Sequence, residues 1–349
     1  MQRFPLGKVP ASDLQRIVFR NLGVPNKRLL LGPKIGEDAA VVEMDDSLIV
    51  LSTDPIAGAL ANIGWLSVHI NANDVATRGA RPVWYLCSIM LPEGSGKSTL
   101  KRIMAQIDRA SRELGITVVG GHSETTPLLG RPIIVGFMVG EVKSNRYVTS
   151  GGAVVGDKLI ITKTAGIEGT AIIANDHEEL LRKRVAKEVV RKAQKLYERI
   201  SVVNDAMIAM DAGGVSAMHD PTEGGVLCGV WELAEASHLG VRINNAKIPV
   251  SIETEAICGR LNIDPLRIMA SGSLLIAAKS SYAARIVAKL ISEGIPATEI
   301  GQFTRYRDGR VMIGRDNSEM NLRPPFQDEV YQVLNRPRQD KGCVWQVWI

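Results

Sequence analysis

Two stretches of alternating strand-like and helix-like segments, separated by a glycine-rich interruption, constrain the fold of this chain most strongly. In the first stretch, apolar runs such as "SLIVLSTD" and "RPVWYLCSIM" alternate with segments whose apolar residues recur at helical spacing. Near "SNRYVTSGGAVVGD" the pattern stops at three glycines, and it starts again with "KLIITKTA". Because both stretches mix helices and strands, each is predicted to be an α/β or α+β layered domain.

The chain has 349 residues, which is enough for two domains with separate cores. We predict a first domain over residues 1–150 and a second over 151–320, with the boundary placed to within about five residues. Residues 321–349 form a predicted C-terminal tail that ends "NRPRQDKGCVWQVWI". This tail is charged and then aromatic, so it is either mobile or a segment that docks its two tryptophans on a partner.

Composition excludes several classes of protein. No apolar run reaches the roughly 18 to 20 residues of a membrane span, and the first residues lack the apolar centre of a signal peptide, so we expect a cytoplasmic protein without a membrane partner. The net charge is only +5, and its densest part, residues 180–200, has acids among its basic residues. That segment is typical of a solvated helix face, and nucleic acid is not expected as a partner.

The segment "LPEGSGKSTL" has the strand, glycine-rich loop and helix order of a P-loop. The P-loop pattern requires glycine five residues before Gly96, but Leu91 occupies that position and Pro92 removes an amide donor. We therefore predict an ordinary strand-to-helix turn capped by Ser95 or Ser98, with no phosphate held at Lys97.

Acids and glycines gather in four other segments, "GEDAAVV", "LSTDP", "NANDVATRGARP" and "MHDPTEGGV". Their acids Asp38, Asp54, Asp74 and Asp220 are flanked by apolar or glycine residues, where an isolated carboxylate is costly to bury. Asn71 precedes Asp74 by three residues, on the same face of a predicted helix. Mg²⁺ is commonly held by one or two carboxylates together with substrate phosphates, so these segments suit a site for a magnesium–nucleotide complex.

An ordinary role also remains open for each acid taken alone. Asp38 fits a turn, Asp74 fits a solvated helix position, and Asp220 fits the acidic start of a helix. Spacing along the chain does not show whether the four carboxylates meet in space.

The order of six segments resembles the AIR synthase (PurM-like) superfamily over roughly residues 36–301. These segments are "GEDAAVV", "STDP", "INANDVATRGARP", "VVGGHSETT", "DPTEGGV" and "SGSLLIA". Within that superfamily, "DPTEGG" followed by "IPV", "DPL" and "SGSLLIA" is most similar to the hydrogenase maturation factor HypE and HypE-related proteins.

The resemblance implies a PurM-like two-domain fold and a homodimer. Strands of the N-terminal α/β domain would pair with those of a second subunit in a dimeric β-barrel, and a C-terminal α+β domain would close the cleft. ATP would lie in this cleft with Mg²⁺ between its phosphates and the protein.

The resemblance also implies roles for individual residues. Metal ligands would be Asp38, Asp54, Asp74 and Asp220, and the residues near the phosphates would be Thr53, Asn71, Gly120, Gly121 and Thr222. The catalytic residues would be Asp74, Asp220 and His122.

The chain departs from the family pattern at three places. It lacks the Pro-Arg-Ile-Cys tail of HypE and has Cys343 six residues before its end. Glu37 stands where many members have aspartate. His122 follows the two glycines where other branches have an acid, and Glu124 lies two residues further on.

These observations lead to one main functional hypothesis and two alternatives. The main one is an ATP- and Mg²⁺-dependent enzyme that phosphorylates an amide, carbonyl or hydroxyl oxygen of an unidentified small molecule or partner protein. The first alternative is a kinase of a small metabolite, of the thiamine-monophosphate kinase type. The second is a nucleotide-binding assembly factor without catalysis.

Overall fold

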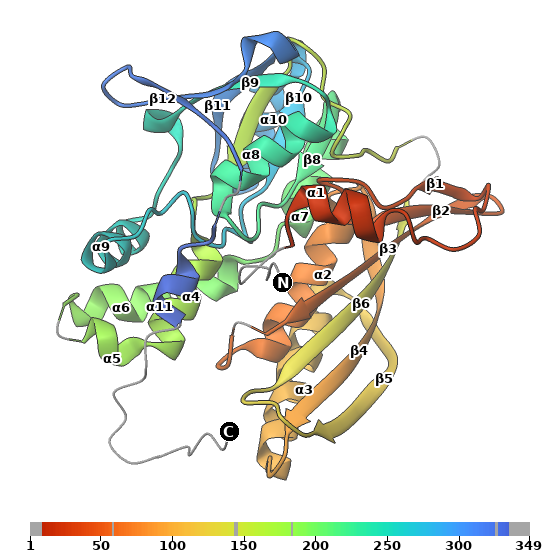
Figure 1. Ribbon diagram of the computed structural model, residues 1–349, viewed down its shortest axis with the longest axis vertical. Helices are drawn as coiled ribbons and strands as arrows, with labels where there is room; N and C mark the ends of the chain where they lie inside the picture. The colour runs from red at the N-terminus through yellow and green to blue at the C-terminus, as the bar shows by residue number, and fades with distance from the viewer. Residues whose placement is uncertain (1–8, 58, 143–145, 183, 325–326, 335–349) are drawn as a thin grey trace.

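The computed structural model describes residues 9–57, 59–142, 146–182, 184–324 and 327–334. The N-terminal half forms a six-stranded sheet with α2 (Ile63–Ala76) and α3 (Lys97–Leu114) on one side (Figure 1). Only the pair of β4 and β5 is parallel. In spatial order the strands are β1 (Leu29–Leu31), β2 (Ala40–Met44), β3 (Ser47–Ile56), β6 (Ile133–Val142), β4 (Arg81–Pro92) and β5 (Thr117–Thr126).

Helix α2 is buried along its whole length because the sheet covers one side and the C-terminal half covers the other. Two glycines of β6 let it approach the sheet. A Cβ atom at Gly136 would lie 2.3 Å from Asn71 Nδ2, and one at Gly140 would lie 2.2 Å from Val75 Cγ1. The position of α2, and with it the position of Asn71, therefore depends on the absence of side chains at these two places.

The C-terminal half is built on a seven-stranded sheet. Its strands are, in spatial order, β13 (Glu319–Asn321), β12 (Arg310–Ile313), β9 (Gly240–Asn244), β11 (Ala297–Thr304), β7 (Lys158–Thr162), β10 (Leu275–Ala278) and β8 (Val215–His219). Its central strands are apolar on both faces, which is typical of a sheet covered on both sides. Ile160 packs in the core with α7 (Val203–Ala212) and α10 (Ser280–Ser292), while its neighbours Leu159 and Ile161 pack with α8 (Gly225–Ala236).

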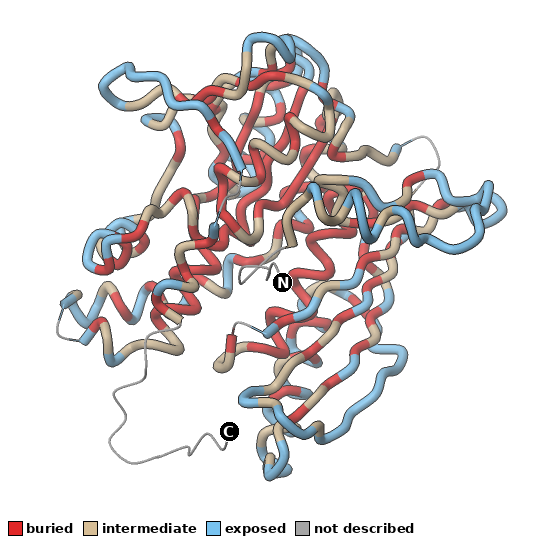
Figure 2. The backbone as a smooth tube through the Cα atoms, viewed as in Figure 1, coloured by how far each residue is buried: buried red, intermediate tan, exposed pale blue. Residues whose placement is uncertain are grey.

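A group of helices beside this sheet has a small core of its own. It comprises α4 (Ile167–Asp176), α5 (Glu178–Leu181), α6 (Lys187–Gln194), α9 (Ile252–Leu261) and α11 (Val330–Leu334). The remaining helical turns are α1 (Ala11–Asp13), η1 (Leu14–Val18), η2 (Leu196–Arg199), η3 (Asn245–Lys247) and η4 (Tyr306–Asp308). The largest core cluster joins residues of both halves, from Leu31 to Ala297 (Figure 2).

The structure corrects two details of the sequence prediction. The segment at residues 180–200 is not one helix but is divided into α5, α6 and η2. The start of the predicted tail is part of the fold, since residues 327–334 include the buried side chains of Val330 and Val333. The two tail tryptophans lie outside the described residues. Of the helices described, none is both long and apolar enough to cross a membrane.

The predicted dimeric barrel stays a prediction, because a single subunit shows the N-terminal sheet with β1 and β5 at its two edges. Together the two sheets and their helices form the two-domain, mixed α/β fold that the resemblance implied.

Candidate metal and nucleotide site

Helix α2 carries two of the predicted site residues on one buried face. Asn71 Oδ1 accepts a hydrogen bond from the Asp54 backbone N–H at 2.8 Å, and Asn71 Nδ2 donates to the Asp54 carbonyl at 3.3 Å. This pair of bonds fixes the backbone of β3 where the Asp54 side chain begins. Asp74, one turn further along α2, accepts a hydrogen bond from the Ser52 hydroxyl. The alternative in which Asp74 is a solvated helix position is wrong, because only 5% of this residue is exposed.

Asp220 comes from the other half of the chain, directly after β8, and is fully buried. Neither of its carboxylate oxygens has a hydrogen-bond partner among the residues that the structure describes. Leaving a buried carboxylate uncompensated costs several kcal/mol by order of magnitude. This arrangement indicates that a group from outside the protein chain completes the surroundings of Asp220.

The four predicted carboxylates lie close enough to affect one another electrostatically. Burial raises the pKa of Asp74 well above its usual value, and the charges of Asp220, Asp54 and Asp38 raise it further. Burial and the charges of Asp38 and Asp54 likewise raise the pKa of Asp220. The fold therefore brings together carboxylates from four segments of both halves, which spacing along the chain could not establish.

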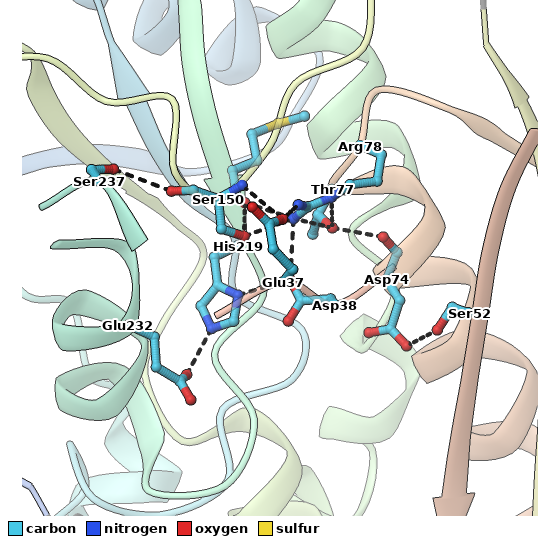
Figure 3. A network of polar contacts seen from close by, with 11 residues as sticks. Glu37, Asp38, Ser52, Asp74, Thr77, Arg78, Ser150, His219, Glu232 and Ser237 are labelled. Atoms are coloured by element: carbon cyan, nitrogen blue, oxygen red, sulfur yellow. Dashed lines mark hydrogen bonds and ion pairs between the residues drawn. The ribbon is translucent and has the colours of Figure 1, made fainter. Parts of the chain in front are cut away.

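A fully buried arginine, Arg78, anchors the segment that carries Asp38 (Figure 3). Its guanidinium donates hydrogen bonds to Glu37, to Asp38 at 3.2 Å, to Ser150 Oγ at 2.9 Å and to the Met218 carbonyl at 3.1 Å. The Ser150 N–H also donates to Glu37 at 3.1 Å. These bonds join the loop before β2, the end of α2 and strand β8. Arg78 therefore fixes the two halves of the chain relative to each other around the acidic residues.

A second cation candidate, His219, lies between two carboxylates. Its Nδ1 is 2.8 Å from Asp38 and its Nε2 is 2.9 Å from Glu232. Burial alone would lower the pKa of His219, but the charge of Asp38 and the hydrogen bonds to both carboxylates raise it to about 10. His219 is thus held as a cation at neutral pH, and it links Asp38 to helix α8.

The donor set fits Mg²⁺ bound together with phosphates rather than a cage made wholly by the protein. Among the described residues, no group of three or more His, Cys, Asp or Glu side chains is arranged to hold a metal ion. Mg²⁺ commonly uses one or two carboxylates and completes its octahedron with water and substrate phosphates. The raised pKa values of Asp74 and Asp220 and the bare oxygens of Asp220 are the features that a cation would compensate.

Two predicted threonines lie near these acids in the sequence. Thr53, beside Asp54 on β3, donates its hydroxyl to the Gly136 carbonyl at 2.8 Å and is exposed. Thr222 follows Asp220 and is partly buried, and its carbonyl accepts a hydrogen bond from the Gly225 N–H at 3.1 Å. Thr222 therefore helps to form the turn that opens α8.

The predicted residues of "VVGGHSETT" lie on the edge strand β5, which is exposed along almost its whole length. The side chains of His122 and Glu124 are exposed and contact each other at 3.2 Å. Gly121 has a φ of 151°, and a Cβ there would lie 2.2 Å from the Cys87 carbonyl oxygen. Glycine is required at position 121 because β4 lies too close for a side chain there, independently of any contact that Gly121 makes with phosphate.

Lys97 begins α3 and is exposed, as expected for an ordinary turn. The predicted cap is wrong, because Gly96 occupies the N-cap position and no side chain caps the helix.

The sequence analysis missed Arg78 and His219. Both stand inside segments that were singled out, "NANDVATRGARP" and "MHDPTEGGV". In each case a basic side chain stands beside apolar residues whose pattern is typical of buried segments. A cation that is buried with them requires carboxylates nearby, and this requirement could have pointed to both residues.

The family models account for most of the chain. Residues 36–142 match the model described as AIR synthase related protein, N-terminal domain, and residues 154–314 match the corresponding C-terminal domain. Carbamoyl dehydratase HypE of Cupriavidus necator is 30% identical over 288 residues, which are 80% of this chain and 79% of the relative. The chain belongs to the AIR synthase related family.

Solved structures share the fold of this family member. HypE in complex with ATP matches with a TM-score of 0.70 at 22% identity, over 94% of this chain and 98% of that one. AaThiL complexed with AMPPCP and TMP also gives 0.70 at 22% identity, over 90% of this chain and 97% of that one.

Proposed function

We propose that this protein is an ATP- and Mg²⁺-dependent enzyme that transfers a phosphoryl group to an amide, carbonyl or hydroxyl oxygen. The observation that carries the proposal is the meeting of Asp38, Asp54, Asp74 and Asp220, with both oxygens of Asp220 buried and bare. Such a site binds a divalent cation, and a cation held by few carboxylates leaves coordination positions for phosphate oxygens.

The chain supplies orientation and charge for this reaction. Asp74 and Asp220, from opposite halves, would hold the metal, while Asn71 fixes the backbone of Asp54. Arg78 and His219 keep Asp38 in place through a salt bridge and a hydrogen bond. When bound, Mg²⁺ would neutralise charge on the phosphates, which is the main contribution of metal ions in phosphoryl transfer. The comparison with HypE bound to ATP and AaThiL bound to AMPPCP supports an adenine nucleotide as the phosphoryl donor.

The site assignment is tested by calorimetric titration of Mg-ATP. We expect Asp74→Asn to abolish binding because the metal loses a carboxylate from α2. Lys97→Ala is the control, because Lys97 is exposed at the start of α3 and should leave the affinity unchanged. Unchanged affinity in Asp74→Asn would contradict the metal site, and lost affinity in Lys97→Ala would restore the P-loop interpretation.

The acceptor is sought by a thermal-shift screen of metabolites with Mg-ATP present, because a true ligand stabilises the folded state by mass action. Chromatography of the product then separates two outcomes. A stable phosphoester identifies a metabolite kinase, whereas a transient phosphorylated amide identifies dehydration or ligase chemistry. The same slow release of ADP with and without every candidate would favour a non-catalytic nucleotide-binding protein.

A further inference from the structure

Glu168 is a buried carboxylate that the proposed metal site does not use. It lies in the first turn of α4 and is only 6% exposed. Its Oε2 accepts a hydrogen bond of 2.6 Å from the Ser271 hydroxyl, in the "SGSLLIA" segment. Among the described residues, it forms no salt bridge with a lysine or arginine. A glutamate buried for structure alone would be expected to have a cationic partner or backbone N–H donors.

Other buried acids of the same half have such partners. Asp205 pairs with Lys163 at 2.9 Å, and Asp328 accepts hydrogen bonds from the backbone N–H groups of Gly224 and Val330. Among the buried carboxylates that the structure describes in the C-terminal half, Asp220 and Glu168 stand apart from this pattern. Asp220 has a counterpart in the proposed metal, so the surroundings of Glu168 require a different explanation.

The position of Glu168 places it at the junction of the two halves. It lines a small cavity together with Ala59 and Leu66 from the N-terminal half and Ile172 of its own helix. The charge of Asp54, at the proposed metal site, acts on its carboxyl group. Ser271, which hydrogen-bonds Glu168, directly follows Ala270, whose backbone N–H donates to the Thr222 carbonyl at 3.4 Å, two residues after Asp220. Glu168 is thus linked through this segment to the proposed metal site but is not among its ligands.

We propose that Glu168 is the catalytic residue that accepts the proton of the acceptor group during phosphoryl transfer. This inference rests on the proposed function. The oxygen of a hydroxyl or amide acceptor forms a bond to the γ-phosphorus of ATP, and its O–H or N–H proton passes to the Glu168 carboxylate. The bond from that phosphorus to the β,γ-bridging oxygen breaks, and ADP leaves with the electron pair. Glu168 then returns the proton to solvent.

The electrostatic surroundings of Glu168 suit this role. Burial raises its pKa from 4.5 to about 7, the Ser271 hydroxyl opposes this rise, and Asp328, Asp54 and Glu223 add to it. Near it, the Tyr331 hydroxyl donates a hydrogen bond to Glu223. A proton acceptor works best when its pKa lies near the working pH, so Glu168 combines a sufficient ionised fraction with enough basicity.

The test uses the full chain with Mg-ATP, with water as the acceptor, and measures ADP formation against pH. In the parent, kcat should rise as the pH passes through about 7, where Glu168 loses its proton. Glu168→Gln should lower kcat by roughly 100-fold or more and should abolish the rise of kcat with pH. Its calorimetric affinity for Mg-ATP should be unchanged. Glu188→Gln, at an exposed acid paired with Arg191, is the control and should behave as the parent does.

Two further readouts separate a chemical role from a structural one. Ser271→Ala removes the hydrogen bond that lowers the Glu168 pKa, so the limb of the kcat profile should move to higher pH. Without ligands, the folded parent binds this proton more tightly than the unfolded chain, so its stability should fall between about pH 4.5 and 7. Glu168→Gln should lack only the part of this fall that Glu168 contributes, because Asp328, whose pKa is also raised to about 7, still titrates in this range. Its urea midpoint should therefore fall less than that of the parent, and it should be the more stable protein above pH 7.

The outcomes separate this inference from the proposed function. A parent that forms ADP while Glu168→Gln keeps the same kcat and pH limb overturns the role of Glu168 alone. Lost Mg-ATP affinity in Glu168→Gln also overturns it, because the residue would then belong to the binding site. A parent that forms no ADP, either with water or with any acceptor found by the thermal-shift screen, overturns both the catalytic part of the proposed function and this inference.

Discussion

At the scale of single residues, the site contains two kinds of buried charged side chain, one with hydrogen-bond partners in the protein and one without them among the described residues. Arg78 is fully buried and donates hydrogen bonds to two carboxylates, two hydroxyls and a carbonyl, whereas Asp220 is fully buried and its carboxylate oxygens have no hydrogen-bond partner among the described residues. The first arrangement keeps the halves together without a ligand. The second leaves buried carboxylate oxygens that a bound cation can compensate, which is typical of binding sites.

Replacing Arg78 by alanine should destabilise the protein by about 3–5 kcal/mol, because Glu37 and Asp38 would lose the guanidinium that compensates their largely buried charges. The measurement is urea unfolding of the ligand-free protein. Arg112→Ala is the control, because Arg112 is exposed and pairs with Asp108 one helical turn away, so it should cost about 0.5 kcal/mol or less. Equal losses in the two variants would contradict the anchoring role of Arg78.

At the scale of elements, the contact between α2 and β6 sets the position of the metal site. The two glycines of β6 remove the side chains that would hold α2 away from the sheet, and Asn71 of α2 bonds to the backbone of Asp54. A small displacement of the helix would therefore move Asn71 and Asp74 together relative to β3.

Gly136→Ala should destabilise the protein by about 1–3 kcal/mol, since the new methyl group would overlap the Asn71 amide. It should also weaken Mg-ATP binding, because the Asn71 bonds to Asp54 would be broken or strained. Urea unfolding and calorimetry measure the two effects. The matched change Gly130→Ala meets nothing within 4 Å and should leave both quantities unchanged. Parental Mg-ATP affinity in Gly136→Ala would show that the site tolerates movement of α2.

At the scale of the whole molecule, the sheet of the N-terminal half has exposed apolar side chains on its open side. Trp84 of β4 and Phe137 of β6 are at least one-third exposed, whereas their chain neighbours Tyr85 and Met138, which point to the other side of the sheet, are fully buried. Such a surface commonly marks contact with another protein. It supports the prediction that a second copy of the chain packs there.

We expect a dimer by light scattering of the purified protein. Phe137→Glu should give a monomer, because a charge on β6 would have to be buried in the contact between subunits. Met104→Glu, at an exposed position of α3 on the other side of the sheet, serves as a control for added charge and should remain dimeric. A monomeric mass for the parent would contradict the predicted assembly.

The sequence by itself determined much of this protein. Period-two and helical patterns identified most strands and helices, because an element must bury one face whatever its neighbours are. The ordered motifs around Asp38, Asp54, Asp74 and Asp220 gave the family and the candidate metal ligands. The missing glycine at Leu91 excluded a P-loop, since a nest of amides is a local property of the chain.

Only the tertiary structure decided which charges meet. Asp74 and Asp220 are 146 positions apart, and their mutual effect on pKa arises because α2 and the end of β8 are packed together. Arg78, His219 and Glu168 gained their importance in the same way, from burial and from partners supplied by distant segments. Electrostatic energy depends on distance and solvent access in the folded chain, and neither quantity is written in a linear pattern.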